Sequence, residues 1–208
     1  MTTPTTDTNA ILTAVRRFAV ACDYEQQHAE QVTRLAETLF DALQPLHKLD
    51  ASGRLCLTCA GLLHDIGWLN GQKGHHKRSM EMILDEPTLP LSPVERATIA
   101  LTARYHRKAL PKPWHTLYAS LSRTRRKTVD ILAAILRVAD GLDRSHTDAV
   151  CDVEIVLSDN RIEFLCRCRG NAGAELKFAK KKADLLERLF GRTAVFTQAP
   201  IKSESSLK

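Results

Sequence analysis

The chain has 208 residues, 44% hydrophobic and 26% charged, so it can bury a core as one medium domain or as one domain with a small appendage. Its longest apolar stretch, residues 55–69, is interrupted by His64 and Asp65 and is too short for a bilayer, and the Thr-rich start lacks the features of a secretory signal, so we expect a cytoplasmic protein without membrane contact. The formal net charge of +6 favours anionic partners without choosing among phosphate compounds, nucleic acid and acidic proteins.

Residues 1–9 read as a flexible tail, and helical periodicity then dominates as far as residue 148. The fifth predicted helix has the clearest start, because Ser92 can cap it, Pro93 suits its first turn and Glu95 completes a capping box. The predicted helices span residues 10–21, 24–43, 51–66, 77–84, 93–105 and 124–140.

From about residue 149 the pattern changes to the alternation that is typical of strands. Residues 151–157 and 162–168 predict a β-hairpin, residues 176–189 a helix that Gly191 ends, and residues 193–196 a returning strand. Residues 197–208 read as a second flexible tail. The sequence therefore predicts a mainly α protein, with a helical domain over 10–148 and a small ββαβ appendage over 149–196.

Several metal-ligand types lie on apolar helix faces. Asp65 and His64 end a stripe of small and apolar residues, Asp140 falls on the core face of its helix, and His28 and His106 share faces with aliphatic residues. An unpaired buried carboxylate is unfavourable, and a divalent cation would compensate it while accepting the imidazole lone pairs. We therefore predict a site with mixed nitrogen and oxygen ligands, suited to Mn, Fe, Co, Ni, Zn or Mg.

The sequence segments that flank these residues resemble those of a known protein family. The order His28, then His64-Asp65, then Asp140 looks like the signature of the HD phosphohydrolase superfamily, in which these four positions bind metal. The segments LLHDIGW, GHHKRS, RYHRKAL, RVADGLDRSH and ELKFAKKKADLLERLFGR together resemble the C-terminal HD region of the exopolyphosphatase and guanosine pentaphosphate phosphatase family. The resemblance covers roughly residues 10–196 and implies an HD-type helical bundle.

The resemblance also implies site residues. Some HD proteins add two histidines between the HD pair and the last aspartate, and His76 and His106 match them by position, with His75 as a rival to His76. These ligands would hold one or two divalent ions, and Asp65 would be the catalytic residue that bridges and orients them. In the resembled family a preceding actin-like module carries the polyphosphate chemistry. This chain has no room for that module, so we expect a free-standing HD module.

We therefore predict a metal-dependent phosphohydrolase acting on a phosphate ester or anhydride, with a nucleotide or a polyphosphate-like compound as substrate. Lys77, Arg107, Lys108 and Arg144 lie near ligand positions in the sequence and are candidates to hold phosphate oxygens. One alternative is a regulatory module that senses a phosphorylated molecule without turnover. A second alternative is a nucleic-acid-binding adaptor, which only the positive net charge supports. A homodimer is possible.

Two cysteines and three further histidines are not expected to take part in the site. Cys56 and Cys59 form a C-x-x-C without a second pair at matching spacing, so we expect them to pack in the core as thiols. His47, His115 and His146 lack settings like those of the candidate ligands and are predicted to lie at the surface.

Overall fold

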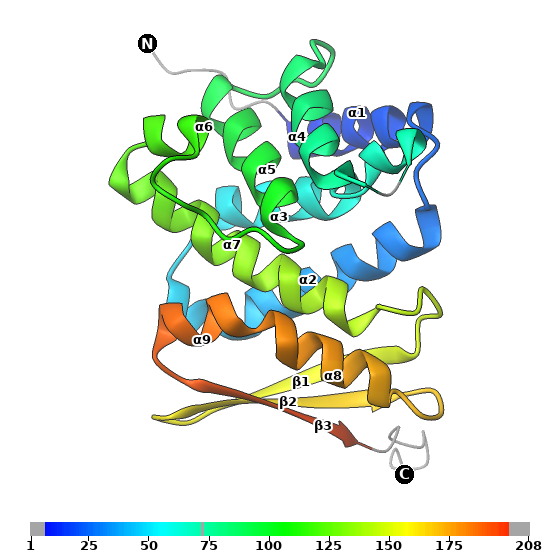
Figure 1. Cartoon of the computed structure of the whole chain (residues 1–208), viewed down its shortest axis with the longest axis vertical. Coiled ribbons are helices and arrows are strands. Elements are labelled where there is room, and N and C mark those ends of the chain that lie inside the picture. Colours follow the sequence, from blue (N-terminus) through cyan, green and yellow to red (C-terminus); the bar gives the residue numbers. More distant parts are fainter. Residues whose placement is uncertain (1–6, 72, 200–208) are drawn as a thin grey trace.

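The computed structural model describes residues 7–71 and 73–199, and it is mainly helical with a small sheet at the C-terminal end (Figure 1). This is the fold class that the change of periodicity near residue 149 predicts. The helices are α1 (Thr8–Ala21), α2 (Gln26–His47), α3 (Ala51–Leu63), the 3-10 helix η1 (Ile66–Asn70), α4 (His75–Asp85), α5 (Pro93–Tyr105), α6 (Thr116–Ser120), α7 (Arg123–Leu142), α8 (Gly173–Lys182) and α9 (Asp184–Phe190). The strands are β1 (Val150–Leu157), β2 (Arg161–Cys168) and β3 (Thr193–Ala199).

Helix α7 is the centre of the structure. It begins at Arg123, after Ser122 caps it by accepting a hydrogen bond from the backbone of Arg125. Every residue from Val129 to Leu142 is buried except Asp130 and Asp140. Helix α7 contacts α2, α3, α5, α8 and α9, so an acid on this helix is surrounded by other elements rather than by water.

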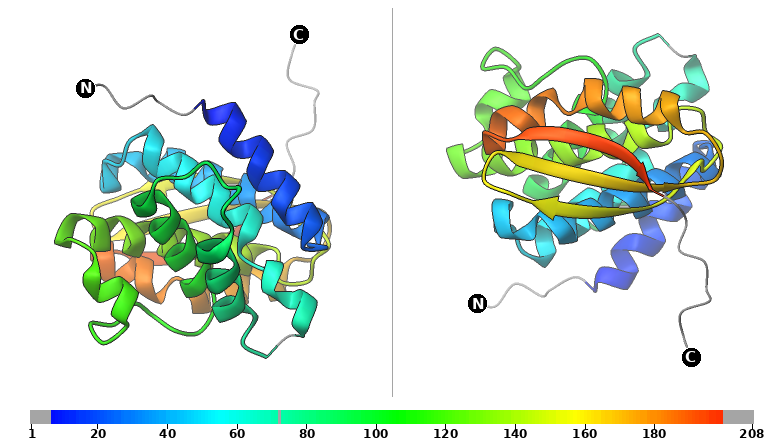
Figure 2. Two further views of the ribbon diagram at one scale, coloured as in Figure 1. Left: turned by 90° about the horizontal axis from the view of Figure 1, so that it is seen from above. Right: turned by 90° about the horizontal axis from the view of Figure 1, so that it is seen from below.

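The sheet lies below the helices, with α8 and α9 between it and α7 (Figures 1 and 2). Strands β1 and β2 form the predicted antiparallel hairpin, and β3 pairs parallel to β2 after the α8–α9 crossover. Phe164 and Phe196 stack on the inner face, with ring centroids 4.3 Å apart. The inner face of the sheet therefore supports α8, the helix that borders the site described below.

Helix α8 approaches α7 closely at Gly141. A Cβ atom there would lie 2.7 Å from the Cα of Ala179, a distance that real Cβ atoms do not reach. The absence of a side chain at Gly141 thus brings the last turn of α8 beside Asp140, the preceding residue of α7.

Several predicted boundaries need correction. Helix α4 begins at His75 rather than residue 77, and helix α3 gives way to η1 near His64. The single helix predicted over 176–189 is two helices, and Arg137 of α7 binds the backbone carbonyl of Lys182 and the carboxylate of Asp184 on the two sides of the break. The capping box at Ser92 and Glu95 is confirmed.

The predicted tails lie largely outside the described residues. Residues 8 and 9 belong to α1, where Asp7 accepts a hydrogen bond from the backbone of Asn9, and residues 197–199 belong to β3, so both tails were predicted too long. Among the described residues, no helix combines the length and apolar character that crossing a membrane requires.

Candidate metal centre

Side chains from α2, α3, α4, α5 and α7 converge on one buried cluster. His28 comes from α2, His64 and Asp65 from the end of α3, His106 from the end of α5 and Asp140 from α7. The ligand atoms of His28, His64 and Asp65 all lie within 4.8 Å of one another, as do those of Asp65, His75 and His106. Asp65 is common to both groups, so it stands between two places where a cation could be held.

Three histidines of the cluster are oriented in the same way. His64 and His106 follow α3 and α5 directly, and each places Nδ1 on the carbonyl three residues earlier, at 2.7 Å and 2.6 Å. His28 places Nδ1 2.8 Å from a carboxylate oxygen of Asp143, which is fully buried. Because a carbonyl or carboxylate only accepts, Nδ1 donates in each case, and the Nε2 atoms of all three histidines turn toward the cluster.

Two of these Nε2 atoms have no hydrogen-bond partner. Within the described part of the chain, Nε2 of His28, Nε2 of His64 and Oδ1 of Asp65 are buried and have no partner in hydrogen-bond geometry. Two of them have an ionisable neighbour, since Oδ1 of Asp140 lies 3.7 Å from Nε2 of His28 and Nε2 of His75 lies 3.1 Å from Oδ1 of Asp65. Buried polar atoms are normally satisfied, so unsatisfied atoms that face one another need a shared partner. Imidazole nitrogens with a carboxylate oxygen are a donor set that suits a divalent transition metal.

The histidines of the cluster differ in their electrostatics. Burial lowers the pKa of His64, and it lowers that of His106 to about 3, so both rings are neutral at pH 7. Burial also acts to lower the pKa of His28, but the neighbouring carboxylates of Asp140 and Asp143 outweigh burial and raise this pKa to about 10. A positive charge at His28 is thus strongly stabilised, and a metal ion on Nε2 would replace that proton.

The structure brings five of the six predicted metal ligands together but not His76. His75, the rival left open by the sequence, takes the place instead: it is 2% exposed, and its Nε2 lies 3.1 Å from Oδ1 of Asp65. It does so because α4 begins at this residue, and its ring stacks on Trp68. His76 points differently, with its ring centroid 6.4 Å from that of His106.

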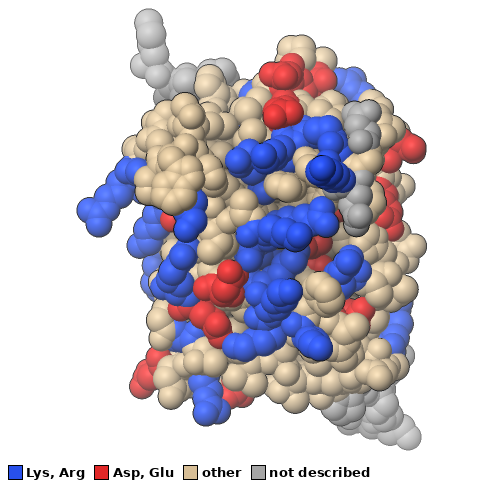
Figure 3. Space-filling view, viewed as in Figure 1, with Lys and Arg blue, Asp and Glu red and all other residues tan. Residues whose placement is uncertain are grey.

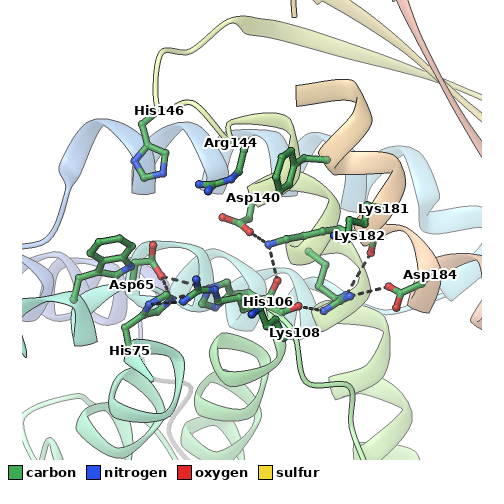
Figure 4. Close-up of a pocket in the computed structure, with 14 residues that line it drawn as sticks. Asp65, His75, His106, Lys108, Asp140, Arg144, His146, Lys181, Lys182 and Asp184 are labelled. Carbon is green, nitrogen blue, oxygen red and sulfur yellow. Dashed lines mark hydrogen bonds and ion pairs between the residues drawn. The ribbon is translucent and has the colours of Figure 1, made fainter. Parts of the chain in front are cut away.

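A cavity of about 430 Å³ opens beside the cluster, and Figure 4 shows the residues that line it. Asp65, His75, His106 and Asp140 lie on one side of it, and basic side chains surround the rest. These basic residues are Arg107, Lys108, Arg137, Arg144, Lys181 and Lys182. Lys and Arg side chains also gather over the middle of this face in Figure 3. The cavity therefore combines candidate metal ligands with basic side chains that attract anions.

Three of the four predicted phosphate-binding residues line this cavity, namely Arg107, Lys108 and Arg144. Lys77 is exposed and is not among the lining residues. Sequence proximity missed Lys181 and Lys182, because α8 is far from the ligands along the chain and reaches them only by packing on α7.

Asp143 and His146 also went unrecognised, although both lie in the segment RVADGLDRSH. His146, which was predicted to lie at the surface, is partly exposed; its ring stacks on His28 at 3.7 Å between centroids, and its Nδ1 contacts Glu25 at 2.8 Å. The predicted surface location was wrong for His47, which is 6% exposed and lies between Phe40 and Leu49. His115 is partly buried and bonds to the hydroxyl of Tyr105 at 2.7 Å.

One comparison with known protein families gives a match. The model for Ppx/GppA phosphatase, domain III, matches residues 11–183. The chain belongs to this family. The matched range of the Ppx/GppA domain III model runs from α1 to the end of α8 and thus contains every candidate ligand and Lys182. A search of the curated proteins gives no match to the chain.

Proposed function

We propose that this Ppx/GppA domain III protein is a divalent-metal-dependent phosphohydrolase with an HD-type ligand set, acting on a phosphate ester or anhydride of a small molecule. The observation that carries the proposal is the set of buried atoms on His28, His64 and Asp65 without partners in hydrogen-bond geometry, of which Asp65 also lines a basic cavity. A purely structural core would leave no such atoms facing one another. The order of these residues with Asp140 along the chain is the one expected for the HD superfamily.

The residues present fit a metal ion. His28, His64, Asp65 and Asp140 would hold it, and Asp143 would fix the orientation of His28 through the 2.8 Å contact with Nδ1. When bound, such an ion would lower the pKa of a water molecule and offset charge on a phosphoryl oxygen. The chain itself would bind and orient the substrate, because Arg107, Lys108 and Arg144 present guanidinium and ammonium donors to its phosphate oxygens.

The test combines metal analysis with phosphate release. The purified protein, loaded with Mn²⁺, Co²⁺, Zn²⁺ or Mg²⁺, is assayed on nucleotides, sugar phosphates and short polyphosphates, alongside Asp65→Ala. The matched control is Asp159→Ala, which removes an exposed carboxylate from the β1–β2 turn. We expect metal binding and turnover in the wild type and in the control. We expect both metal binding and turnover to fall below the wild-type level in the Asp65→Ala variant. The variant should keep the far-UV circular dichroism spectrum of the wild type.

The same experiment addresses the alternative, a module that senses a phosphorylated molecule without turnover. The ion pair between Lys182 and Asp140 is the observation that favours this alternative, because it neutralises the charge of one candidate ligand. Metal binding with saturable phosphate-ester binding but no release of phosphate from any compound would support sensing and contradict the hydrolase. Absence of metal binding would contradict both.

A further inference from the structure

We propose that the cavity holds a second anion-binding site, apart from the candidate metal centre, in which Arg137 and Lys181 bind a phosphoryl group that competes with Asp184. The ligand is a phosphate dianion, either as the free ion or as a phosphoryl group that a bound compound does not lose in the reaction. The site requires no metal ion, so this inference goes beyond the proposed function and can be tested without it.

Arg137 is a buried cation in the wall of the cavity, and its side chain is only 5% exposed. Its Nε donates a hydrogen bond to the carbonyl of Lys182 at 3.3 Å. Its Nη1 donates to the carbonyl of Tyr105, also at 3.3 Å, and to the carbonyl of Arg107. Carbonyl groups carry no net charge, so they fix the guanidinium in place without neutralising it. The charge of Arg137 is compensated at the remaining nitrogen, Nη2.

The compensating charge comes from Asp184, whose Oδ1 lies 2.8 Å from Nη2 of Arg137 (Figure 4). The two side chains line the same cavity but differ in exposure, because that of Asp184 is 48% exposed. A buried guanidinium needs a partner of opposite charge, whereas a half-exposed carboxylate is well solvated without one. Asp184 is therefore an exchangeable partner, and an anion in the cavity can take its place on Arg137.

The charges of the cavity favour a phosphoryl group over the carboxylate of Asp184. Among the described residues, six basic and three acidic side chains line the cavity, so a ligand with more negative charge is attracted. Lys181 stands three residues before Asp184 and is one of these basic side chains. A phosphate dianion brings two charges and several acceptor oxygens, which can bind the guanidinium of Arg137 and the ammonium group of Lys181 together.

The second site lies away from the candidate metal ligands. In Figure 4, Lys181 and Asp184 lie on one side of the cavity. Asp65 and His75 lie on the other side. Neither Arg137 nor Asp184 belongs to a group of candidate metal ligands. The cavity, with a volume of about 430 Å³, therefore has room for one phosphoryl group beside the metal centre and another beside Arg137.

The experiment titrates the full chain, kept free of metal by a chelator, with inorganic phosphate at constant ionic strength in a calorimeter. Asp184→Asn keeps the size of the side chain and an acceptor oxygen but removes the competing charge, so it should bind phosphate about tenfold more tightly than the wild type. Lys181→Met should bind phosphate about threefold more weakly. The double variant Asp184→Asn/Arg137→Met should lose the gain that Asp184→Asn provides.

Two control variants make the result specific. Asp159→Asn removes an exposed carboxylate far from the cavity, and Lys177→Met removes an exposed lysine of α8 that does not line it, so both should bind phosphate like the wild type. Thermal unfolding checks that each variant is folded, and the single variants decide if the double variant is not. An unchanged phosphate affinity in folded Asp184→Asn overturns the inference and leaves the proposed hydrolase intact. A gain in Asp184→Asn supports it even if the protein neither binds metal nor releases phosphate from any compound.

A second titration distinguishes the two sources of the phosphate group. The Mn²⁺-loaded protein is titrated with linear bisphosphonates of increasing length and with methylphosphonate. If the site holds a phosphoryl group of the bound compound, one length should bind more tightly than methylphosphonate, and Asp184→Asn should enlarge that difference. If the site holds free phosphate, no length should have this advantage, while the gain for inorganic phosphate in Asp184→Asn persists. Either result supports the site and identifies its source.

Discussion

Replacing Asp143 by Asn should weaken metal binding without changing the shape of the site. The carboxylate of Asp143 accepts two hydrogen bonds, one at Oδ2 from Nδ1 of His28 (2.8 Å) and one at Oδ1 from the backbone N–H of Asp148 (3.0 Å). An amide has only one acceptor oxygen, so in either orientation its NH₂ group must face one of these two donors. One buried donor then stays unsatisfied, and the centre loses one of its negative charges.

The magnitude follows from these two losses. A buried donor without a partner costs about 1–3 kcal/mol in the free energy of unfolding. Loss of the group that orients a ligating histidine reduces metal affinity by about 10–100-fold. Urea denaturation in the presence of a chelator measures the first effect, and calorimetric titration with Mn²⁺ measures the second. Asp159→Asn, an exposed change of the same type, serves as the control. Wild-type metal affinity in a folded Asp143→Asn protein would refute the assigned role of Asp143.

Three further predictions concern stability. Gly141→Ala should lower the free energy of unfolding by about 1–3 kcal/mol, measured by urea denaturation, because its Cβ would press against the backbone of Ala179 and separate α7 from α8. Arg137→Met should cost about 1–3 kcal/mol in the same assay, because this guanidinium, 4% exposed, donates to the buried carbonyl of Tyr105 and to the carbonyl of Lys182 at the break between α8 and α9. His47→Gln should flatten the pH dependence of stability below about pH 6.5. Burial lowers the pKa of His47 from its ordinary 6.5, so the unfolded chain takes up the proton first and stability falls as pH drops.

Each of these predictions has a matched comparison. Ala174→Ser is a mild change at an exposed position of α8 and should not affect unfolding. Arg123→Met, at the exposed start of α7, should cost far less than the Arg137 change. For His47, the wild type and the variant should differ more at pH 7.5 than at pH 5, since protonation already removes the contribution of His47 at low pH. A difference that stays constant or grows on acidification would contradict the assigned buried, neutral state.

The periodicity of the sequence was sufficient for the fold class because local patterns determine local structure. The helical stripe in α7 and the alternation in β1 and β2 each follow from which residues need burial. The predicted helix over 176–189 failed at its centre because its apolar spacing continues across Ala183. At the break, Lys182 and Asp184 both accept hydrogen bonds from Arg137, which lies far away in the sequence.

Some residues of the candidate site could be predicted from the sequence, and others could not. His28, His64, Asp65, His106 and Asp140 could be found because polar ligand types on apolar faces conflict with the surrounding pattern, and that conflict is visible in the sequence. The choice between His75 and His76 was not visible, because it depends on where α4 begins and on the contact with Trp68.

By itself, the sequence determined the mainly helical class, the helix that carries each acid and five of the candidate metal ligands. The tertiary structure alone decided which basic side chains lie beside those ligands, because the position of Lys182 depends on α8 lying against Gly141 of α7, and that of Arg107 on its contact with His75. The physical reason is that burial preferences are encoded residue by residue, whereas the distance between two charges is set by all the elements packed between them.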